Sequence, residues 1–292
     1  MALIEISELF LSGLRFSAPL ILAAMAGLYS ERSGVVQLAL EGFMLFGAFV
    51  AGTAAYYTSD GPAGIMAAVL FGALAGIFYG FLVIKLRADQ IVAGTVINML
   101  AWGGIPVVCK NLFDSTAGTP TLELSQRLPS WFPIVIAFAV VLITAWIFKQ
   151  TAFGLRLSVA GEKPEALEAV GVNPRNLRWA AVMIAGALAG LAGGLLSVCL
   201  SAGYSRNMTA GRGFMALAAL ILGKWKPWPA FLGCLLFGFC EVVQLKAQGV
   251  AIPFVGVLPG QLIQVVPYVV TLALIAGLVG VSRAPAKLGH SS

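Results

Sequence analysis

The stretch AGIMAAVLFGALAGIFYGFLVI, residues 63–84, contains 22 residues and no charged side chain. A bilayer core of about 30 Å is crossed by about 20 apolar residues in a helix, so this stretch predicts a transmembrane helix. The rest of the chain has the same character. Its 292 residues are 60% hydrophobic and 10% charged, with a mean hydropathy of +0.95, whereas a soluble globular chain carries roughly 25% charged residues. We therefore expect one transmembrane domain over residues 1–292.

Seven further stretches have the length and composition of a membrane span. They are Leu9–Tyr29, Val35–Tyr57, Ile91–Cys109, Trp131–Phe148, Trp179–Ala202, Pro229–Leu245 and Leu262–Val281. The apolar run Phe214–Leu222 is too short to cross alone, and we expect a half-helix there. The predicted fold class is an all-α polytopic membrane protein with about 8–10 transmembrane helices.

The basic residues indicate the orientation, because cytoplasmic loops are enriched in Lys and Arg. The connection 149–178 is the most basic loop of the chain, so we place it in the cytoplasm. If the short segment crosses, this predicts an external N-terminus and a cytoplasmic C-terminus. The net charge of +6 is spread over short loops between apolar spans and forms no continuous patch. Nucleic acid is therefore not expected as a partner.

Several kinds of catalytic or metal site find no support. The only histidine, His290, lies in the C-terminal tail, which excludes histidine-based triads and H-E-x-x-H zinc sites. The four cysteines have no C-x-x-C spacing, and we interpret them as packing residues. No G-x-x-x-x-G-K-[ST] motif occurs. We expect no enzyme, no metal and no bound cofactor, with any ATP carried by a partner subunit.

A weak internal similarity connects the two halves of the chain. Tyr29-Ser30 followed by Gly42-Phe43-Met44 returns as Tyr204-Ser205 followed by Gly213-Phe214-Met215. In the predicted topology the first copy begins inside and the second outside. This relation is expected of inverted repeats, which often place a transport site between them. Chance similarity in a chain rich in Gly, Phe and Met is nearly as good an explanation.

Ionisable residues within apolar spans are costly, so they indicate functional or paired sites. Arg15, Glu41 and Glu241 are of this kind. Gln37 precedes Glu41 by four residues and is expected on the same helix face. Glu41 either lines the solute path or forms a structural ion pair, for example with Arg15. Glu241 is a path candidate nearer to a span end, where snorkelling to the interface is the simpler alternative.

Asn98 and Trp102 place an amide and an indole four residues apart within one span. A nucleobase or sugar ring could hydrogen-bond to the first and stack on the second. The alternatives, an interhelical hydrogen bond from Asn98 and interfacial anchoring by Trp102, are more common. Phe43 is a further candidate for the path, with core packing as its alternative.

The cytoplasmic sequence GEKPEALEAVGVNP, residues 161–174, predicts a short helix. Pro164 suits the first helical position, and Gly171 suits the left-handed residue that ends a helix. Asn173 then suits the cap of the next helix. Such a two-turn helix between two spans can transmit a push.

In this segment the chain resembles the permease subunits of ATP-binding-cassette (ABC) importers, whose cytoplasmic signature is Glu-Ala-Ala, three residues, then Gly. Glu165, Ala166 and Gly171 match it, while Leu167 replaces the second Ala. The resemblance implies that these four residues form the coupling helix, which docks on the ATPase subunit. The Leu167 departure leaves the docking detail open, and an ordinary capped surface helix is the alternative.

Further strings narrow the resemblance to the ribose and branched-chain amino acid permeases, and within them to permeases for nucleosides or simple sugars. These strings are LYSERSGVV (28–36), LEGFM (40–44), GTVIN (94–98), GLRL (154–157) and MTAGRGF (208–214). The resemblance implies an inner-membrane importer of a nucleoside or simple sugar. It also implies ABC ATPase subunits, a second permease copy or paralogue, an extracytoplasmic solute-binding protein and membrane lipid as partners. The rivals are a secondary transporter driven by an ion gradient through Glu41 or Glu241, and a membrane-embedded enzyme.

Overall fold

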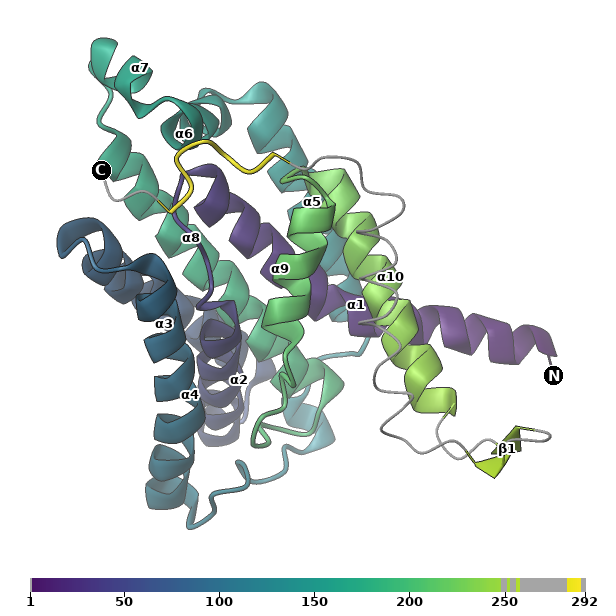
Figure 1. Ribbon diagram of the computed structural model, residues 1–292. Helices are drawn as coiled ribbons and strands as arrows, with labels where there is room; N and C mark the ends of the chain where they lie inside the picture. Colours follow the sequence, from purple (N-terminus) through teal and green to yellow (C-terminus); the bar gives the residue numbers. More distant parts are fainter. Residues whose placement is uncertain (1, 248–250, 253–255, 258–282, 290–292) are drawn as a thin grey trace.

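The computed structural model describes residues 2–247, 251–252, 256–257 and 283–289, and this part is built mainly of helices (Figure 1). The α-helices are α1 (Ala2–Arg32), α2 (Leu40–Thr58), α3 (Gly61–Gly80), α4 (Gln90–Phe113), α5 (Phe132–Gln150), α6 (Ala152–Glu162), α7 (Pro164–Ala169), α8 (Pro174–Leu195), α9 (Arg212–Leu222) and α10 (Pro227–Ala247). The π-helical turns Phe81–Lys85 and Leu196–Leu200 continue α3 and α8, and a 3₁₀ turn covers Leu124–Gln126. Two short antiparallel strands are β1 (Ala251–Ile252) and β2 (Gly256–Val257).

Six helical stretches of the described residues are long and apolar enough to cross a membrane. They are Glu8–Arg32, Gly61–Lys85, Gln90–Phe113, Phe132–Gln150, Pro174–Leu200 and Pro227–Lys246. Each corresponds to a predicted span, so the all-helical polytopic fold class is confirmed. The predicted half-helix is α9, with 11 residues. The predicted span Leu262–Val281 lies outside the described residues.

The predicted span Val35–Tyr57 is wrong at its start, because α2 begins only at Leu40. Gly34 turns the chain with a φ of +95°, and residues 35–39 are not helical. Hydropathy alone could not reveal this break. Val35, Val36 and Leu38 are apolar, but their backbone groups are bonded by side chains of neighbouring helices, as described below.

A second non-helical segment, residues 201–211, precedes α9. It pairs with the loop between α4 and α5, where Thr119 N donates to Tyr204 O at 3.0 Å and Leu122 N donates to Ala202 O at 2.9 Å. Both α2 and α9 therefore start after an irregular segment inside the fold.

Helix α8 lies in the middle of the bundle, against α1, α2 and α3. Its glycines permit very close approach, because small residues let transmembrane backbones pack tightly. A Cβ on Gly193 would lie 1.8 Å from the Met44 carbonyl oxygen, and one on Gly186 would lie 2.2 Å from that of Gly72. A larger side chain at either position would force the helices apart.

The described part of the C-terminal tail, residues 283–289, lies at the same end of the bundle as α6 (yellow in Figure 1). Lys287 N donates to Gly161 O at 2.8 Å, and Gly289 N donates to Gly34 O at 3.1 Å. The tail therefore bridges α6 and the turn that follows α1. Helix α6 itself was not predicted; Thr151 caps it by accepting from Gly154 N at 3.2 Å.

Candidate functional site

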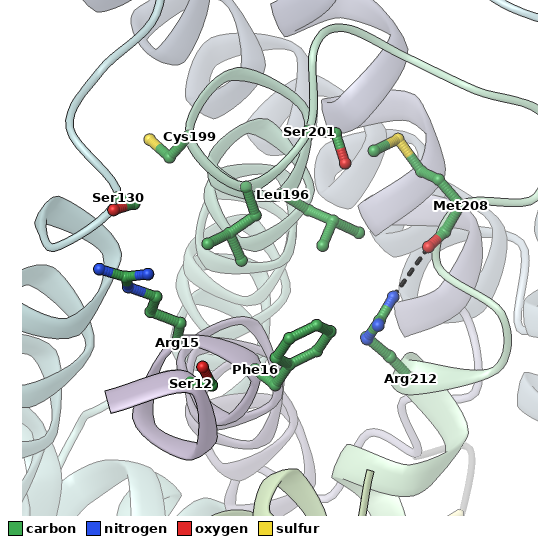
Figure 2. Close-up of a pocket in the computed structure, with 10 residues that line it drawn as sticks. Ser12, Arg15, Phe16, Ser130, Leu196, Cys199, Ser201, Met208 and Arg212 are labelled. Atoms are coloured by element: carbon green, nitrogen blue, oxygen red, sulfur yellow. Dashed lines mark hydrogen bonds between the residues drawn. The ribbon is translucent and has the colours of Figure 1, made fainter. Parts of the chain in front are cut away.

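A polar cavity of about 390 Å³ lies where α1, the π-helical end of α8 and the start of α9 meet (Figure 2). Its lining residues are Ser12, Arg15, Phe16, Ser130, Leu196, Cys199, Leu200, Ser201, Met208 and Arg212. The volume lies within the range of about 300–1,000 Å³ typical of small-molecule sites. A π-helical turn also frequently marks a functional site. We regard this inner cavity as the candidate solute site.

Arg212 is fixed on one side of the inner cavity. Its Nη1 donates to Met208 O at 2.8 Å, and its Nη2 forms an ion pair with the Glu241 carboxylate. The guanidinium carbon lies 5.9 Å from the centre of the Phe16 ring. Glu241 is thus the ion-pair partner of Arg212. It is not itself a lining residue of the cavity, whereas Arg212 is. In this arrangement Glu241 neutralises one of the two cavity arginines.

Arg15 supplies the second guanidinium, on the other side of Phe16 in the view of Figure 2. Its Nε is buried and has no hydrogen-bond partner. The ion pairs found among the described residues are Arg212–Glu241 and Lys287–Glu165, so neither neutralises Arg15. The expected alternative of a Glu41–Arg15 pair is not what the structure shows. A charged donor group is therefore left at the cavity wall.

Glu41 is fully buried and holds the start of α9. Its carboxylate accepts from Thr209 Oγ1 at 2.5 Å, from Gly211 N at 2.9 Å and from Gly213 N at 2.7 Å. The first N–H groups of a helix have no partner within the helix, and its N-terminus favours negative charge. The geometry favours a structural role for Glu41, as the cap of α9.

Gln37 does not share a helix face with Glu41, because it precedes α2 in the non-helical segment. It is fully buried, and its Oε1 accepts from Ser30 Oγ at 3.1 Å. Its backbone N makes a long contact of 3.5 Å with the Glu31 carboxylate. Glu31 in turn accepts from Trp225 Nε1 at 2.5 Å. Gln37 therefore belongs to a buried network at the end of α1.

Both the oxygen and the nitrogen of the Asn98 side-chain amide form hydrogen bonds with the backbone around the start of α2. Its Nδ2 donates to Leu38 O at 2.9 Å, and its Oδ1 accepts from Gly42 N at 2.8 Å. The Tyr79 hydroxyl binds the same non-helical segment, donating to Val36 O at 2.5 Å. These bonds favour the interhelical alternative for Asn98 over contact with solute.

Phe43 and Trp102 lie in different surroundings. Phe43 is fully buried and packs edge-to-face on Tyr79, with ring centres 6.2 Å apart. It lines an apolar cavity of about 230 Å³ between α2, α3 and α4. Trp102 is 44% exposed and lines a second polar cavity, of about 400 Å³, which we call the outer cavity. Its other lining residues are Leu45, Tyr204, Arg206 and Asn207.

The segment 201–211 contributes to both polar cavities. Ser201 and Met208 line the inner cavity, while Tyr204, Arg206 and Asn207 line the outer one. Trp102 therefore lines its cavity together with residues of this segment, and Asn98 is not one of the lining residues. These loop residues could not be singled out from the sequence, because Arg206 and Asn207 have the polarity of ordinary solvated loop residues.

The predicted coupling segment has the expected local geometry. Helix α7 begins at Pro164, Gly171 has a φ of +74°, and Asn173 Oδ1 accepts from Arg175 N at 2.9 Å at the start of α8. Ala166 is exposed, whereas Leu167 is buried. The residue that departs from the importer signature therefore points into the protein.

Glu165 projects from the first turn of α7, and its side chain is 70% exposed. Its Oε1 lies 3.6 Å from Lys287 Nζ of the C-terminal tail. A hydrogen bond from its own backbone N–H, and next the charge of Lys287, hold the pKa of the Glu165 carboxyl below its usual value. The carboxylate is thus ionised at neutral pH and available to a basic partner surface.

Residues 9–279 match the family described as branched-chain amino acid transport system / permease component. The chain belongs to this permease family. The permease is 33% identical to the guanosine ABC transporter permease protein NupQ of Bacillus subtilis (strain 168), over 94% of this chain and 92% of the relative. It is 35% identical to the nucleoside ABC transporter permease protein NupC of Lactococcus lactis subsp. cremoris (strain MG1363), over 92% of each.

The permease also shares its fold with a solved structure, an inward-facing conformation of a transporter described as a metal-chelate type ABC transporter. The TM-score is 0.51 at 16% identity, and the match covers 92% of this chain and 85% of that one. At this identity the similarity concerns the fold alone.

Proposed function

We propose that this permease is the membrane-spanning subunit of an ABC importer that translocates nucleosides, driven by ATP hydrolysis on a partner subunit. The observation that carries the proposal is the full-length similarity to two permeases named for guanosine and nucleosides. The inner cavity adds a polar space of suitable size, with an aromatic ring between two arginines. In this role the chain is a conduit and performs no catalysis.

The partners follow from this assignment. Two ABC ATPase subunits bind ATP, and one of them docks on α7 of this chain. A second permease copy or paralogue completes the path, and an extracytoplasmic binding protein delivers the solute. The connection 149–178 and the tail then face the cytoplasm, and the N-terminus faces outward. The positions of Lys149, Arg156 and Arg175 in that connection support this orientation.

The contacts suggest how a push on α7 reaches the solute site. The tail touches both α7, through Lys287 and Glu165, and the turn at Gly34. That turn leads into the segment before α2, and Glu41 in the first turn of α2 holds α9. Movement of α7 would thus shift the start of α9, where Arg212 lines the inner cavity. Two helices joined by a carboxylate can move as one unit.

The test is uptake of radiolabelled guanosine by proteoliposomes that contain the permease, its ATPase and its binding protein. We expect ATP-dependent uptake that unlabelled nucleosides inhibit and that glucose and leucine leave unchanged. Inhibition by a sugar or by leucine, without inhibition by nucleosides, would overturn the nucleoside assignment and leave the importer class standing.

A further inference from the structure

The inner cavity is rich in hydrogen-bond donors. Arg15 presents a guanidinium that neither ion pair of the described residues neutralises, and Ser12, Ser130 and Ser201 add hydroxyl groups. The residues described as lining the cavity include no Asp or Glu, and the Glu241 carboxylate is ion-paired with Arg212. Guanidinium groups donate and never accept. A solute that fits this wall must therefore present acceptor atoms towards Arg15.

We infer that Arg15 selects purine nucleosides that carry an oxygen at C6, such as guanosine and inosine; this inference rests on the proposed function. The O6 and N7 atoms of such a base form a pair of acceptors on one edge, and the planar guanidinium fork bonds both at once. Adenosine has an amino group in place of O6. Its donor would face the Arg15 donors, so adenosine is expected to bind more weakly.

Phe16 supplies the surface on which the base lies. Its ring lines the same cavity, and Figure 2 shows it between the Arg15 and Arg212 side chains. Base stacking on an aromatic ring tolerates any base, so Phe16 would add affinity and Arg15 would add selectivity. The serine hydroxyls can donate to or accept from ribose hydroxyls. The arrangement thus divides base recognition between two neighbouring residues of α1.

The charge of Arg15 also makes an anion a rival ligand. A nucleoside is neutral, whereas a nucleotide or inorganic phosphate would neutralise the guanidinium as well as accept its hydrogen bonds. Displacement of bound guanosine by inorganic phosphate, and not by inosine, would identify an anion site and overturn the inference.

The experiment measures binding to the permease–ATPase complex in lipid nanodiscs without the binding protein, so that the selectivity of the binding protein does not contribute. Radiolabelled guanosine is displaced by inosine, adenosine or cytidine in a scintillation proximity assay. We expect inosine to compete at a concentration similar to that of guanosine, and adenosine to need a concentration at least about fivefold higher. Absence of nucleoside binding in this complex would overturn the inference, while uptake by the complete importer still decides the proposed function.

Two variants test Arg15 itself. In Arg15→Gln the amide matches the N6 and N7 atoms of adenine, so the preference should move from guanosine towards adenosine. In Arg15→Lys the charge stays and the fork is lost, so guanosine affinity should fall about fivefold or more while the chain keeps its charge. The matched control is Arg206→Gln in the outer cavity, which should leave the preference unchanged.

Each outcome for the Arg15 and Arg206 variants has one interpretation. An unchanged guanosine-to-adenosine ratio in Arg15→Gln, in protein with the melting temperature of the unmodified complex, would overturn the inference. A change of preference in Arg206→Gln alone would move base recognition to the outer cavity. If Arg15→Gln does not fold, Arg15→Lys decides, because unchanged guanosine affinity in that variant contradicts bidentate recognition.

Discussion

The Glu41 carboxylate, in the first turn of α2, accepts a hydrogen bond from Gly213 N, the second residue of α9, at 2.7 Å. The two helix starts also touch, since a Cβ on Gly213 would lie 2.5 Å from Glu41 N. Each helix follows a non-helical segment. The candidate solute site therefore lies beside the point where the starts of α2 and α9 meet through one buried carboxylate.

Replacing Glu41 with Gln should lower stability and transport together. The variant keeps one acceptor oxygen but loses the charge that bonds Thr209 Oγ1 and two backbone N–H groups. Hydrogen bonds to charged groups contribute about 1.5–3 kcal/mol each, so the melting temperature of the detergent-purified permease should fall clearly. Lost transport at an unchanged melting temperature would instead point to a role in the solute path.

Replacing Asn98 with Ala should destabilise the permease without changing which solute it prefers. The change leaves Leu38 O and Gly42 N without their amide partner, and an unsatisfied buried group costs about 1–3 kcal/mol. Thr95→Val is the matched control, because the Thr95 hydroxyl bonds only its own helix, at Ile91 O. Thermal melting and nucleoside competition are the two measurements. An altered solute preference in Asn98→Ala would indicate that Asn98 lines the solute path.

Span positions could be predicted from the sequence because bilayer thickness imposes a length that hydropathy reveals directly. The start of α2 could not, since Val35 and Val36 are equally apolar in a helix and in a buried irregular segment. That segment depends on bonds from Tyr79 and Asn98, which lie far along the chain. The short helix α7 was predicted correctly because Pro164 and Gly171 act locally.

The partners of the ionisable residues were harder to predict. Arg15, Glu41 and Glu241 stood out by their charge in apolar spans, yet their partners depend on tertiary packing. Glu241 bonds Arg212, the first residue of α9. The opposite charges of Arg212 and Glu241 beside apolar runs were the available signal for this ion pair, because two such groups stabilise each other. The similar strings at 42–44 and 213–215 lie near the starts of α2 and α9, the two helices that meet at Glu41.

Replacing Gly193 with Ala should disrupt the contact between α2 and α8. The added Cβ would lie 1.8 Å from the Met44 carbonyl oxygen, which is backbone and cannot swing away. Overpacking of this kind costs about 1–3 kcal/mol, so the melting temperature should fall. Gly103→Ala is the control, because nothing lies within 4 Å of its Cβ position and alanine favours a helix. Equal melting temperatures for both variants would contradict the packing assigned to α8.

Replacing Glu165 with Lys should weaken assembly with the ATPase and leave membrane insertion intact. The variant reverses an exposed charge on α7 and removes its contact with Lys287. Because the pKa of Glu165 is lowered, the native carboxylate stays charged down through the ordinary Glu range. Its contribution to docking should persist at neutral pH and disappear only as pH falls through the lowered pKa.

Co-purification of the ATPase measures this effect. Lys110→Glu is the matched control, because it reverses an exposed charge in the last turn of α4, away from α7. We expect co-purification with Lys110→Glu at the level of the unmodified permease. Full co-purification and transport with Glu165→Lys would count against α7 as the docking helix.

The source of energy is the most direct test of the account. Proteoliposomes with the permease, its ATPase and its binding protein are loaded with ATP, and guanosine uptake is measured after ionophores have collapsed all ion gradients. We expect uptake that continues with ATP and stops without it. Uptake by the permease alone, sustained by an ion gradient in the absence of ATPase and ATP, would contradict it.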